Sequence, residues 1–231
     1  MGKSLYCNFE NIYVNGCSYT QKDVGHLVWS DFLEKKFNVN CINNAQPGSS
    51  NHRIARRTLE DLLTLNLNPK STMVIIGWSF ITRDEIWHNQ KKFHTFLDTD
   101  IWPDGQFITT DYLRDSKVID QISRMALDHE RQIVHFFQLA FMLIKTLEQM
   151  GYKWLMFSAA MQPDIFYKFP FVQKLKQTQF CIEHNNFHWH MSLLEYAKKY
   201  NVPVKWTGHL LEEGHEHFVD WIIKKGDLSR P

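Results

Sequence analysis

The chain has 231 residues, of which 44% are hydrophobic and 22% are charged, and its formal net charge is +1. This is an ordinary globular composition, and the length suits a single α/β domain spanning residues 1–231. Because there is no polybasic run and no apolar run near ~20 residues, we expect no nucleic-acid partner and no membrane span. The four cysteines lack C-x-x-C spacing and the N-terminus lacks an apolar h-region, which predicts reduced thiols and a cytoplasmic location.

Short apolar runs alternate with helical patterns along the first third of the chain. A strand is predicted at 11–17, and a helix follows at 27–37, where large apolar residues recur at helical spacing. A second strand at 39–45 precedes a helix at 49–65. The run STMVIIGW at 71–78 is the clearest strand, and its unbroken apolar character predicts burial on both faces of a parallel sheet.

The segment from 80 to about 115 breaks this rhythm, because it is polar and rich in aromatic residues. We interpret it as an insertion of the kind that forms a lid or a binding segment. The alternation of strands and helices then resumes. The expected elements are a helix at 117–150 closed by Gly151, a strand at 152–159, an irregular stretch at 162–190, a helix at 191–200, a fifth strand at 201–206 and a helix at 214–225.

This alternation predicts an α/β fold: a three-layer α/β/α sandwich around a parallel sheet of about five strands, of the flavodoxin-like type. Ligands of such sheets bind at the carboxyl ends of the strands, near the point where the strand order reverses. The residues that follow the predicted strands are therefore the first candidates for a site. They are Ser18, Gly48, Ser79 and His209.

These residues contain the parts that acyl transfer requires: a nucleophile, a base and donors aimed at the developing oxyanion. Ser18 offers a hydroxyl, and a histidine after the last strand can take its proton. The backbone N–H groups of Ser18 and Gly48, with a side-chain donor after the third strand, can form an oxyanion hole. Glycine at 48 lets the backbone approach a substrate closely.

Four short motifs resemble those of the SGNH (GDSL-type) hydrolases, in the same order along the chain. Residues 16–20, GCSYT, resemble the block that carries the nucleophile, and residues 44–48, NAQPG, the block that carries the oxyanion glycine. Residues 77–79, GWS, resemble the third block, and His209 precedes Gly214 by the offset of the family's base. The resemblance implies that Ser18 is the nucleophile, His209 the base, and Ser18, Gly48 and Ser79 the oxyanion hole.

The motifs differ from the family pattern at defined positions. Cys17 stands where Asp is usual, and Ser79 stands where the family has its oxyanion asparagine. The triad acid normally lies two or three positions before the histidine, where this chain has Thr207 and Trp206. A Ser–His pair can still function if another group orients the imidazole. Glu212, Glu213 and Asp220 are the candidates for that role, and His215 competes with His209 for the role of base.

Further polar and aromatic residues are candidates for substrate contacts. They are Asn51, Arg83, Glu85 and Trp87. The cluster of histidines at 184–190 raises a metal site as an alternative, but it lacks an H-E-x-x-H motif. We expect no metal and no cofactor.

The sequence thus predicts a serine hydrolase of a small-molecule or carbohydrate ester, such as an O-acetyl group on a sugar. The alternative is a catalytically degenerate domain of the same fold that binds a glycan or another small ligand. The oligomeric state stays open.

Overall fold

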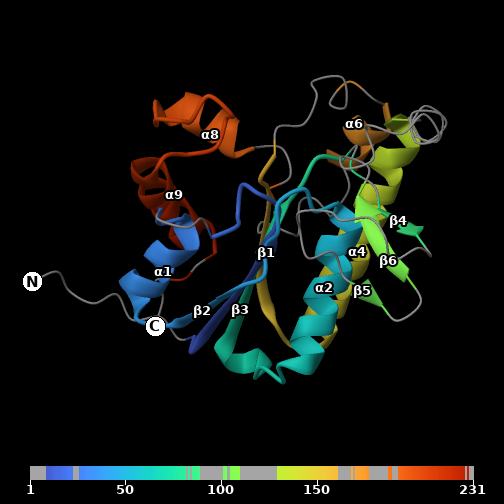
Figure 1. Ribbon diagram of the computed structural model, residues 1–231, viewed down its shortest axis with the longest axis horizontal. Helices are drawn as coiled ribbons and strands as arrows, with labels where there is room; N and C mark the ends of the chain where they lie inside the picture. The colour runs from blue at the N-terminus through green and yellow to red at the C-terminus, as the bar shows by residue number, and fades with distance from the viewer. Residues whose placement is uncertain are drawn as a thin grey trace, which may run out of the picture.

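A computed structural model gives the structure of the protein (Figure 1). It describes residues 9–22, 26–81, 83, 85–88, 101–102, 105–109, 129–160, 168, 170–176, 187–188, 192–226 and 228. These residues form a five-stranded parallel sheet with helices on both faces, together with a separate three-stranded sheet. The predicted three-layer α/β/α fold is therefore confirmed.

The central sheet consists of β1 (Asn11–Gly16), β2 (Asn40–Asn43), β3 (Thr72–Trp78), β7 (Lys153–Ser158) and β8 (Phe187–His188). Its order is β2-β1-β3-β7-β8, and all four pairings are parallel. Every residue of β3 is buried, as its continuous apolar run predicts for a strand covered on both faces. The chain moves from β1 to β2 in one direction and then to β3 on the other side of β1. The strand order thus reverses at β1, where a ligand site is expected.

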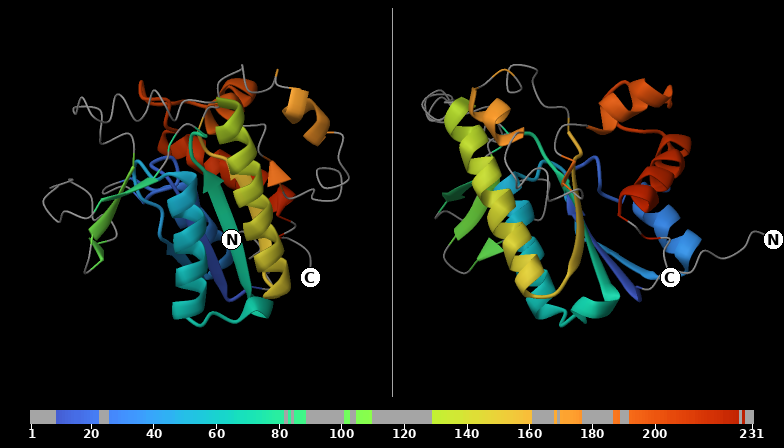
Figure 2. Two further views of the ribbon diagram at one scale, coloured as in Figure 1. Left: turned by 90° about the vertical axis from the view of Figure 1, so that its right-hand side faces the viewer. Right: turned by 180° about the vertical axis from the view of Figure 1, so that it is seen from behind.

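Five of the described helices form the two outer layers. One face is covered by α1 (Trp29–Phe37), α8 (Leu193–Tyr200) and α9 (Glu212–Lys225), and the other by α2 (Asn51–Thr64) and α4 (His129–Gln149) (Figure 2). Successive side chains of β1 enter opposite layers, because strand residues alternate between faces. Ile12 belongs to the hydrophobic core that includes Trp29 of α1. Its neighbour Tyr13 belongs to the core that includes Phe137 of α4.

Polar residues cap the first or last turn of several helices that adjoin the strands. The side chain of Ser50 caps α2 by accepting a hydrogen bond from the backbone N–H of Arg53 at 3.1 Å. Ser192 and Glu195 form a capping box at the start of α8. Asn38 ends α1 in the left-handed conformation, with φ 53°. These caps fix the points at which the chain passes from sheet to helix.

The predicted insertion contains strands of its own. They are β4 (Glu85–His88), β5 (Ile101–Trp102) and β6 (Gly105–Thr109), which pair antiparallel in the order β4-β6-β5. This small sheet lies on the α2 and α4 side of the molecule (Figure 1). The sequence predicted no regular structure there, because the short runs alternate weakly. The reading of the whole chain as one domain with an insertion stays a prediction.

The predicted fifth strand at 201–206 is wrong. β8 occupies the sheet edge instead, next to β7. Pro203 has no N–H to donate to a ladder, and Trp206 is 98% exposed, so this segment cannot form a buried strand. It forms a tight turn, in which Val204 makes an isolated antiparallel bridge with Leu210.

The remaining elements refine the predicted boundaries. A 3₁₀ turn, η1 (Pro69–Ser71), precedes β3, and α6 (Pro170–Lys176) lies in the stretch expected to be irregular. The helix expected from residue 117 is described from His129 onward, and residues 117–128 lie outside the described part of the chain. Among the described helices, none is both long and apolar enough to cross a membrane.

Candidate active site

Ser18 lies in a turn directly after β1. The backbone N–H groups of Thr20 and Gln21 both donate to the carbonyl of Cys17, at 2.9 and 3.0 Å, which folds the chain around Ser18. Thr20 packs so closely on the strand end that a Cβ at Gly16 would come within 2.6 Å of its Oγ1. Glycine is therefore required at 16 for steric reasons. The turn leaves the Ser18 side chain half-buried at the carboxyl end of the sheet.

His209 approaches Ser18 from the turn between α8 and α9. Its Nε2 lies 3.0 Å from Ser18 Oγ, a hydrogen-bonding distance. Two backbone bonds close the turn, from Lys205 N to His209 O at 2.7 Å and from Gly208 N to Lys205 O at 2.9 Å. Gly208 has φ 84°, which favours glycine. The sequence left the choice between His209 and His215 open, and the imidazole that contacts Ser18 is that of His209.

Tyr19 holds the same imidazole from the side. Its ring stacks on that of His209, with the centroids 4.1 Å apart and the planes 13° apart. Phe80 in turn packs against Tyr19 edge-on, at 6.4 Å. Tyr19 is buried, so the stack has a rigid base. Sequence reasoning missed this contact, although Tyr19 lies within the motif that carries Ser18.

Thr207 contacts the other ring nitrogen of His209. Its Oγ1 lies 2.9 Å from Nδ1, so a hydroxyl occupies the position where the SGNH hydrolases, which the motifs resemble, have their acid. The acidic candidates make other contacts: Glu212 accepts from the backbone of Leu27 at 3.4 Å, and Asp220 pairs with Lys36 at 2.6 Å. Glu213 lies exposed in the first turn of α9. The sequence feature that pointed to Thr207 was its spacing: it lies two residues before His209, at a position where the SGNH hydrolases can have their acid.

His215 lies close by on α9 in a different environment. It is 8% exposed, and within the described residues its Nδ1 has no hydrogen-bond partner. Burial lowers the pKa of His215 to about 4, and the positive charges of Lys205 and His209 act in the same direction. The ring is therefore neutral near pH 7.

The loop after β2 is tied to β1 and to the turn of Ser18. Asn43 donates to the carbonyl of Thr20 at 2.8 Å, and the backbone N–H of Asn44 donates to the carbonyl of Val14 at 2.9 Å. The amide of Asn44 also donates to Asp61 at 2.7 Å. Gly48, further along this loop, has φ 71°, a conformation that favours glycine.

Asp61 anchors this loop from α2. It accepts hydrogen bonds from Asn44 and from the hydroxyl of Tyr13, the latter at 2.6 Å. Arg57 pairs with its other oxygen at 3.1 Å. Burial, followed by the nearby charge of Asp61, raises the pKa of the Tyr13 phenol far above its usual range, so Tyr13 stays a donor.

Ser79 is fully buried after β3 and carries two informative contacts. Its Oγ accepts a hydrogen bond from Arg83 Nη1 at 2.9 Å, and its backbone N–H donates to Asn51 Oδ1 at 2.8 Å. The Arg83 guanidinium lies 4.8 Å from the centre of the Phe80 ring. Since Phe80 also packs on Tyr19, Arg83 and Ser79 belong to the same end of the sheet as His209.

The other predicted substrate contacts are placed as follows. The amide of Asn51 donates to the carbonyls of Ser79 and Phe80, at 3.4 and 3.3 Å, so both ends of this side chain bind backbone. Glu85 and Trp87 lie in β4, opposite Thr109 and Phe107 of β6, and their side chains are outside the described part of the structure.

The alternative metal site at 184–190 lies mostly outside the described residues. No group of three or more His, Cys, Asp or Glu there is arranged to hold a metal ion. His188 lies in β8 and packs edge-on against Trp221, with ring centroids 5.0 Å apart. His184 and His190 lie outside the described residues.

Solved structures of hydrolases have the same fold as this chain. A lipolytic protein of the G-D-S-L family from Veillonella parvula DSM 2008 shares 14% identity, over 93% of this chain and 96% of that one, with a TM-score of 0.51. TesA shares 12%, over 93% and 97%, with a TM-score of 0.52. A catalytic mutant of Axe2, an acetylxylan esterase from Geobacillus stearothermophilus, shares 10%, over 94% of each chain, with a TM-score of 0.50. At such identities the likeness establishes the fold alone.

Comparison of the sequence with models of protein families identifies the family of this chain. The model of a family of unknown function, DUF6071, matches residues 19–181, which is more than half of the chain, and the protein belongs to this family. The match begins directly after Ser18 and ends before His209. No curated protein matches the chain.

Proposed function

We propose that this protein is a serine hydrolase that cleaves an acyl ester through an acyl-enzyme at Ser18. The observation that carries the proposal is the 3.0 Å contact between Ser18 Oγ and His209 Nε2 at the carboxyl end of the parallel sheet. A nucleophile and a base within hydrogen-bonding distance form the minimum unit of this chemistry. The contact joins two segments 191 residues apart, so it is a product of the tertiary fold.

In the proposed mechanism, His209 transfers one proton in each half of the reaction. Its Nε2 takes the proton of Ser18 Oγ as that oxygen bonds to the acyl carbon. The bond from the acyl carbon to the alcohol oxygen then breaks, and His209 gives the proton to the departing oxygen. Water attacks the acyl-enzyme with the same assistance, which releases the acid and restores Ser18.

Thr207 is the proposed positioning residue. If His209 Nδ1–H donates to Thr207 Oγ1, the lone pair of Nε2 faces Ser18, which is the tautomer a general base needs. A hydroxyl carries no negative charge, so it stabilises the imidazolium less than a carboxylate does. The stacked ring of Tyr19 adds a second restraint on the imidazole. We therefore expect a working base with a lower rate than a full triad gives.

The oxyanion hole is proposed to consist of the backbone N–H groups of Ser18 and Gly48 and the hydroxyl of Ser79. Ser79 Oγ accepts from the Arg83 guanidinium, and a hydroxyl that accepts from a cation is a stronger donor in turn. This polarisation supports Ser79 as a substitute for the asparagine that donates to the oxyanion in SGNH hydrolases. Arg83 then acts on the oxyanion through Ser79.

The substrate is proposed to be a small ester, with an O-acetyl group on a carbohydrate as the leading example. The same fold in an acetylxylan esterase supports this choice by analogy. The competing proposal is a non-catalytic domain that binds a glycan or small ligand, and the hydroxyl of Thr207 in the place of an acid favours it. Turnover distinguishes the two.

The test is hydrolysis of p-nitrophenyl acetate and butyrate by the purified chain. We expect turnover by the wild type and a loss of at least about a thousandfold in Ser18→Ala and His209→Ala, as when a triad member is removed. Ser71→Ala, at the opposite end of β3, and His135→Ala, on α4, serve as controls and retain activity. Equal rates in wild type and Ser18→Ala would refute the mechanism, and ligand binding without turnover would favour the non-catalytic domain.

A further inference from the structure

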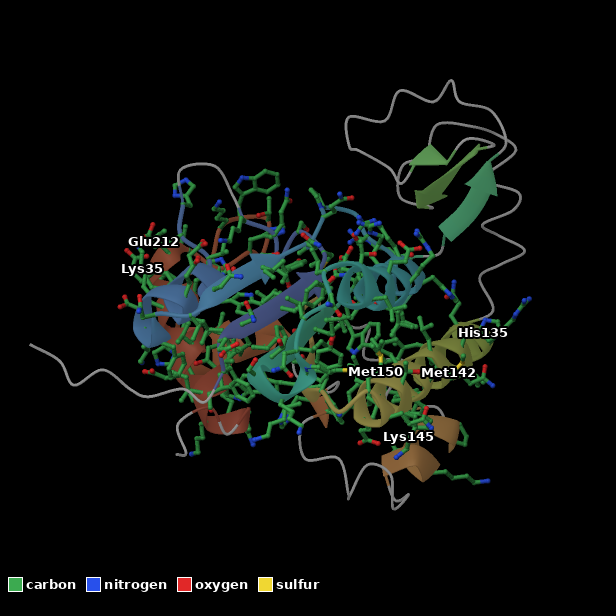
Figure 3. The ribbon with its side chains drawn as sticks, turned by 90° about the horizontal axis from the view of Figure 1, so that it is seen from below. Lys35, His135, Met142, Lys145, Met150 and Glu212 are labelled. Atoms are coloured by element: carbon green, nitrogen blue, oxygen red, sulfur yellow. The ribbon has the colours of Figure 1, made fainter. Side chains whose placement is uncertain are left out.

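A cavity opens beside Ser18 on the α1 and α9 side of the sheet. Its volume is about 330 Å³, and Ser18 and His209 both form part of its wall. In Figure 3, Glu212, also in the wall, and Lys35 of α1 appear on one side of the molecule, and the α4 residues His135 and Met142 appear on the other. The volume is at the low end of the range for small-molecule sites, so the cavity suits one small group.

The polar part of the wall mixes donors and acceptors. It includes an amide, an ammonium group, a hydroxyl, a carboxylate and an imidazole, contributed by Gln21, Lys205, Thr207, Glu212 and His215. The positive charge of Lys205 and the negative charge of Glu212 offset one another. A wall of this kind binds a neutral molecule with many hydroxyl groups, because each hydroxyl is both a donor and an acceptor.

His215 is the most buried of these groups. Its side chain is 8% exposed, and its Nδ1 is buried with no hydrogen-bond partner in the described residues. Of the two ring nitrogens of His215, Nε2 is therefore the one that can form a hydrogen bond with a ligand in the cavity. Because burial lowers the pKa of His215 to about 4, the ring stays neutral at neutral pH and can bind a hydroxyl without attracting an anion.

The direction of proton transfer decides which part of an ester enters this cavity. The imidazole that takes the proton of Ser18 must return it to the departing oxygen, so the alcohol has to lie against His209. In the proposed oxyanion hole, the acyl oxygen would lie instead toward the backbone of Ser18 and Gly48. Since His209 and Ser18 both border the cavity, the alcohol is the part of the substrate that it admits.

We propose that this cavity is the leaving-alcohol subsite, and that it takes a neutral, hydroxyl-rich alcohol such as one sugar unit, bound by Gln21 and His215. The inference rests on the proposed function and adds the place where the leaving alcohol binds and the residues that hold it. It also assigns Gln21 and His215 a role in substrate specificity that the SGNH-like motifs did not suggest.

The test compares two acetyl esters that share the acyl group. One is p-nitrophenyl acetate, whose leaving group needs no hydrogen bonds, and the other is methyl 6-O-acetyl-glucopyranoside. We expect Gln21→Ala and His215→Phe to lower kcat/KM for the sugar ester roughly tenfold more than for p-nitrophenyl acetate, which is the effect of one or two lost hydrogen bonds. His135→Phe is the matched control, and His215→Gln is expected to recover part of the loss.

The outcomes separate the two proposals. If the wild type turns over both esters but the variants lose both equally, or if hexyl acetate is preferred over the sugar ester, the subsite is wrong while the hydrolase stands. If the wild type turns over neither ester, the proposed function fails and the subsite fails with it. Gln21 lies in a half-buried turn, so its variant tests the subsite even if His215→Phe does not fold.

Discussion

At the scale of single residues, the unusual feature is a hydroxyl in the place of a carboxylate. Thr207 contacts His209 Nδ1 at 2.9 Å but is itself exposed to solvent. A carboxylate at this point fixes the tautomer and also stabilises the imidazolium formed during attack. A threonine can do only the first, and water competes for its hydroxyl. The rate of the proposed hydrolysis should therefore change in a graded way with substitutions at 207.

We predict that Thr207→Val lowers kcat for p-nitrophenyl acetate by about tenfold, the effect of one lost hydrogen bond in the transition state. Thr207→Ser should retain activity, and Thr207→Asp should raise kcat by restoring a negative charge beside Nδ1. The measurement is kcat across pH 5–9, with the thermal midpoint of each variant as a folding control. Equal kcat in Thr207→Val and wild type would show that the contact does not position His209.

The order of strands in the sequence indicated part of the proposed site. Ser18 and Ser79 each come directly after a strand, and parallel strands bring such positions to one edge. His209 was placed by a predicted strand at 201–206 that the structure does not contain, and its contact with Ser18 comes instead from the turn between α8 and α9. The stacking of Tyr19 on His209 and the bond from Arg83 to Ser79 were not predictable, because both depend on side-chain directions in loops. No local pattern encodes those directions.

At the scale of elements, Asn51 links α2 to the end of β3. It accepts from Ser79 N at 2.8 Å and donates to the carbonyls of Ser79 and Phe80. The side chain is 3% exposed, so these bonds replace water that the backbone after β3 would otherwise need. The sequence suggested that Asn51 is a substrate contact, whereas these bonds favour a structural role, and the two roles give different results on mutation.

We predict that Asn51→Ala lowers the free energy of unfolding by about 2 kcal/mol, because it leaves buried backbone groups without partners. Urea denaturation measures this change, and Asn51→Asp, which keeps the acceptor for Ser79 N–H but sets a buried carboxylate oxygen against the two carbonyls, should be at least as destabilising as the alanine variant. Unchanged stability together with a raised KM would instead identify Asn51 as a substrate contact.

The strands show why some elements were predictable and one was not. β3 is a continuous apolar run and is buried throughout, so pattern and structure agree. The segment 201–206 also follows a helix and contains two valines, but Pro203 and the exposed Trp206 keep it out of the sheet. β8 has only two residues, too few to show any periodicity, and its place beside β7 is set by tertiary packing.

At the scale of the whole molecule, the sheet separates two cores and the site lies at their common edge. The turn that carries His209 joins α8 to α9, whose apolar faces pack in the core that contains Trp29. The site is therefore complete only when the last part of the chain has packed against the first. His215 lies in α9 at this junction, and its protonation is coupled to the packing.

We predict that acid destabilises the fold through His215. Its pKa is about 4 in the folded state, lowered by burial and by Lys205 and His209 against a smaller opposing effect of Asp31, and 6.5 is its ordinary value. The unfolded chain thus binds the proton more tightly, so this contribution is complete above pH 6.5 and is lost as the pH falls toward 4. Between pH 7.5 and 4.5 the loss is about 2–3 kcal/mol.

Urea denaturation at these two pH values checks this prediction. The difference in unfolding free energy between pH 7.5 and 4.5 should be smaller in His215→Gln than in the wild type, because glutamine does not titrate. Comparison of the two proteins cancels the contribution of the carboxylates that they share. An identical pH dependence in both would contradict the assignment of a depressed pKa to His215.

The most direct test of the central claim is the site of covalent labelling by a fluorophosphonate, located by mass spectrometry of the digested protein. A base that activates Ser18 should direct the phosphonyl group to Ser18 Oγ, with fluoride released. The account predicts one adduct, on the peptide that contains Ser18, which is absent in Ser18→Ala and greatly slowed in His209→Ala. An unlabelled wild type, or a label that persists in Ser18→Ala, would contradict it.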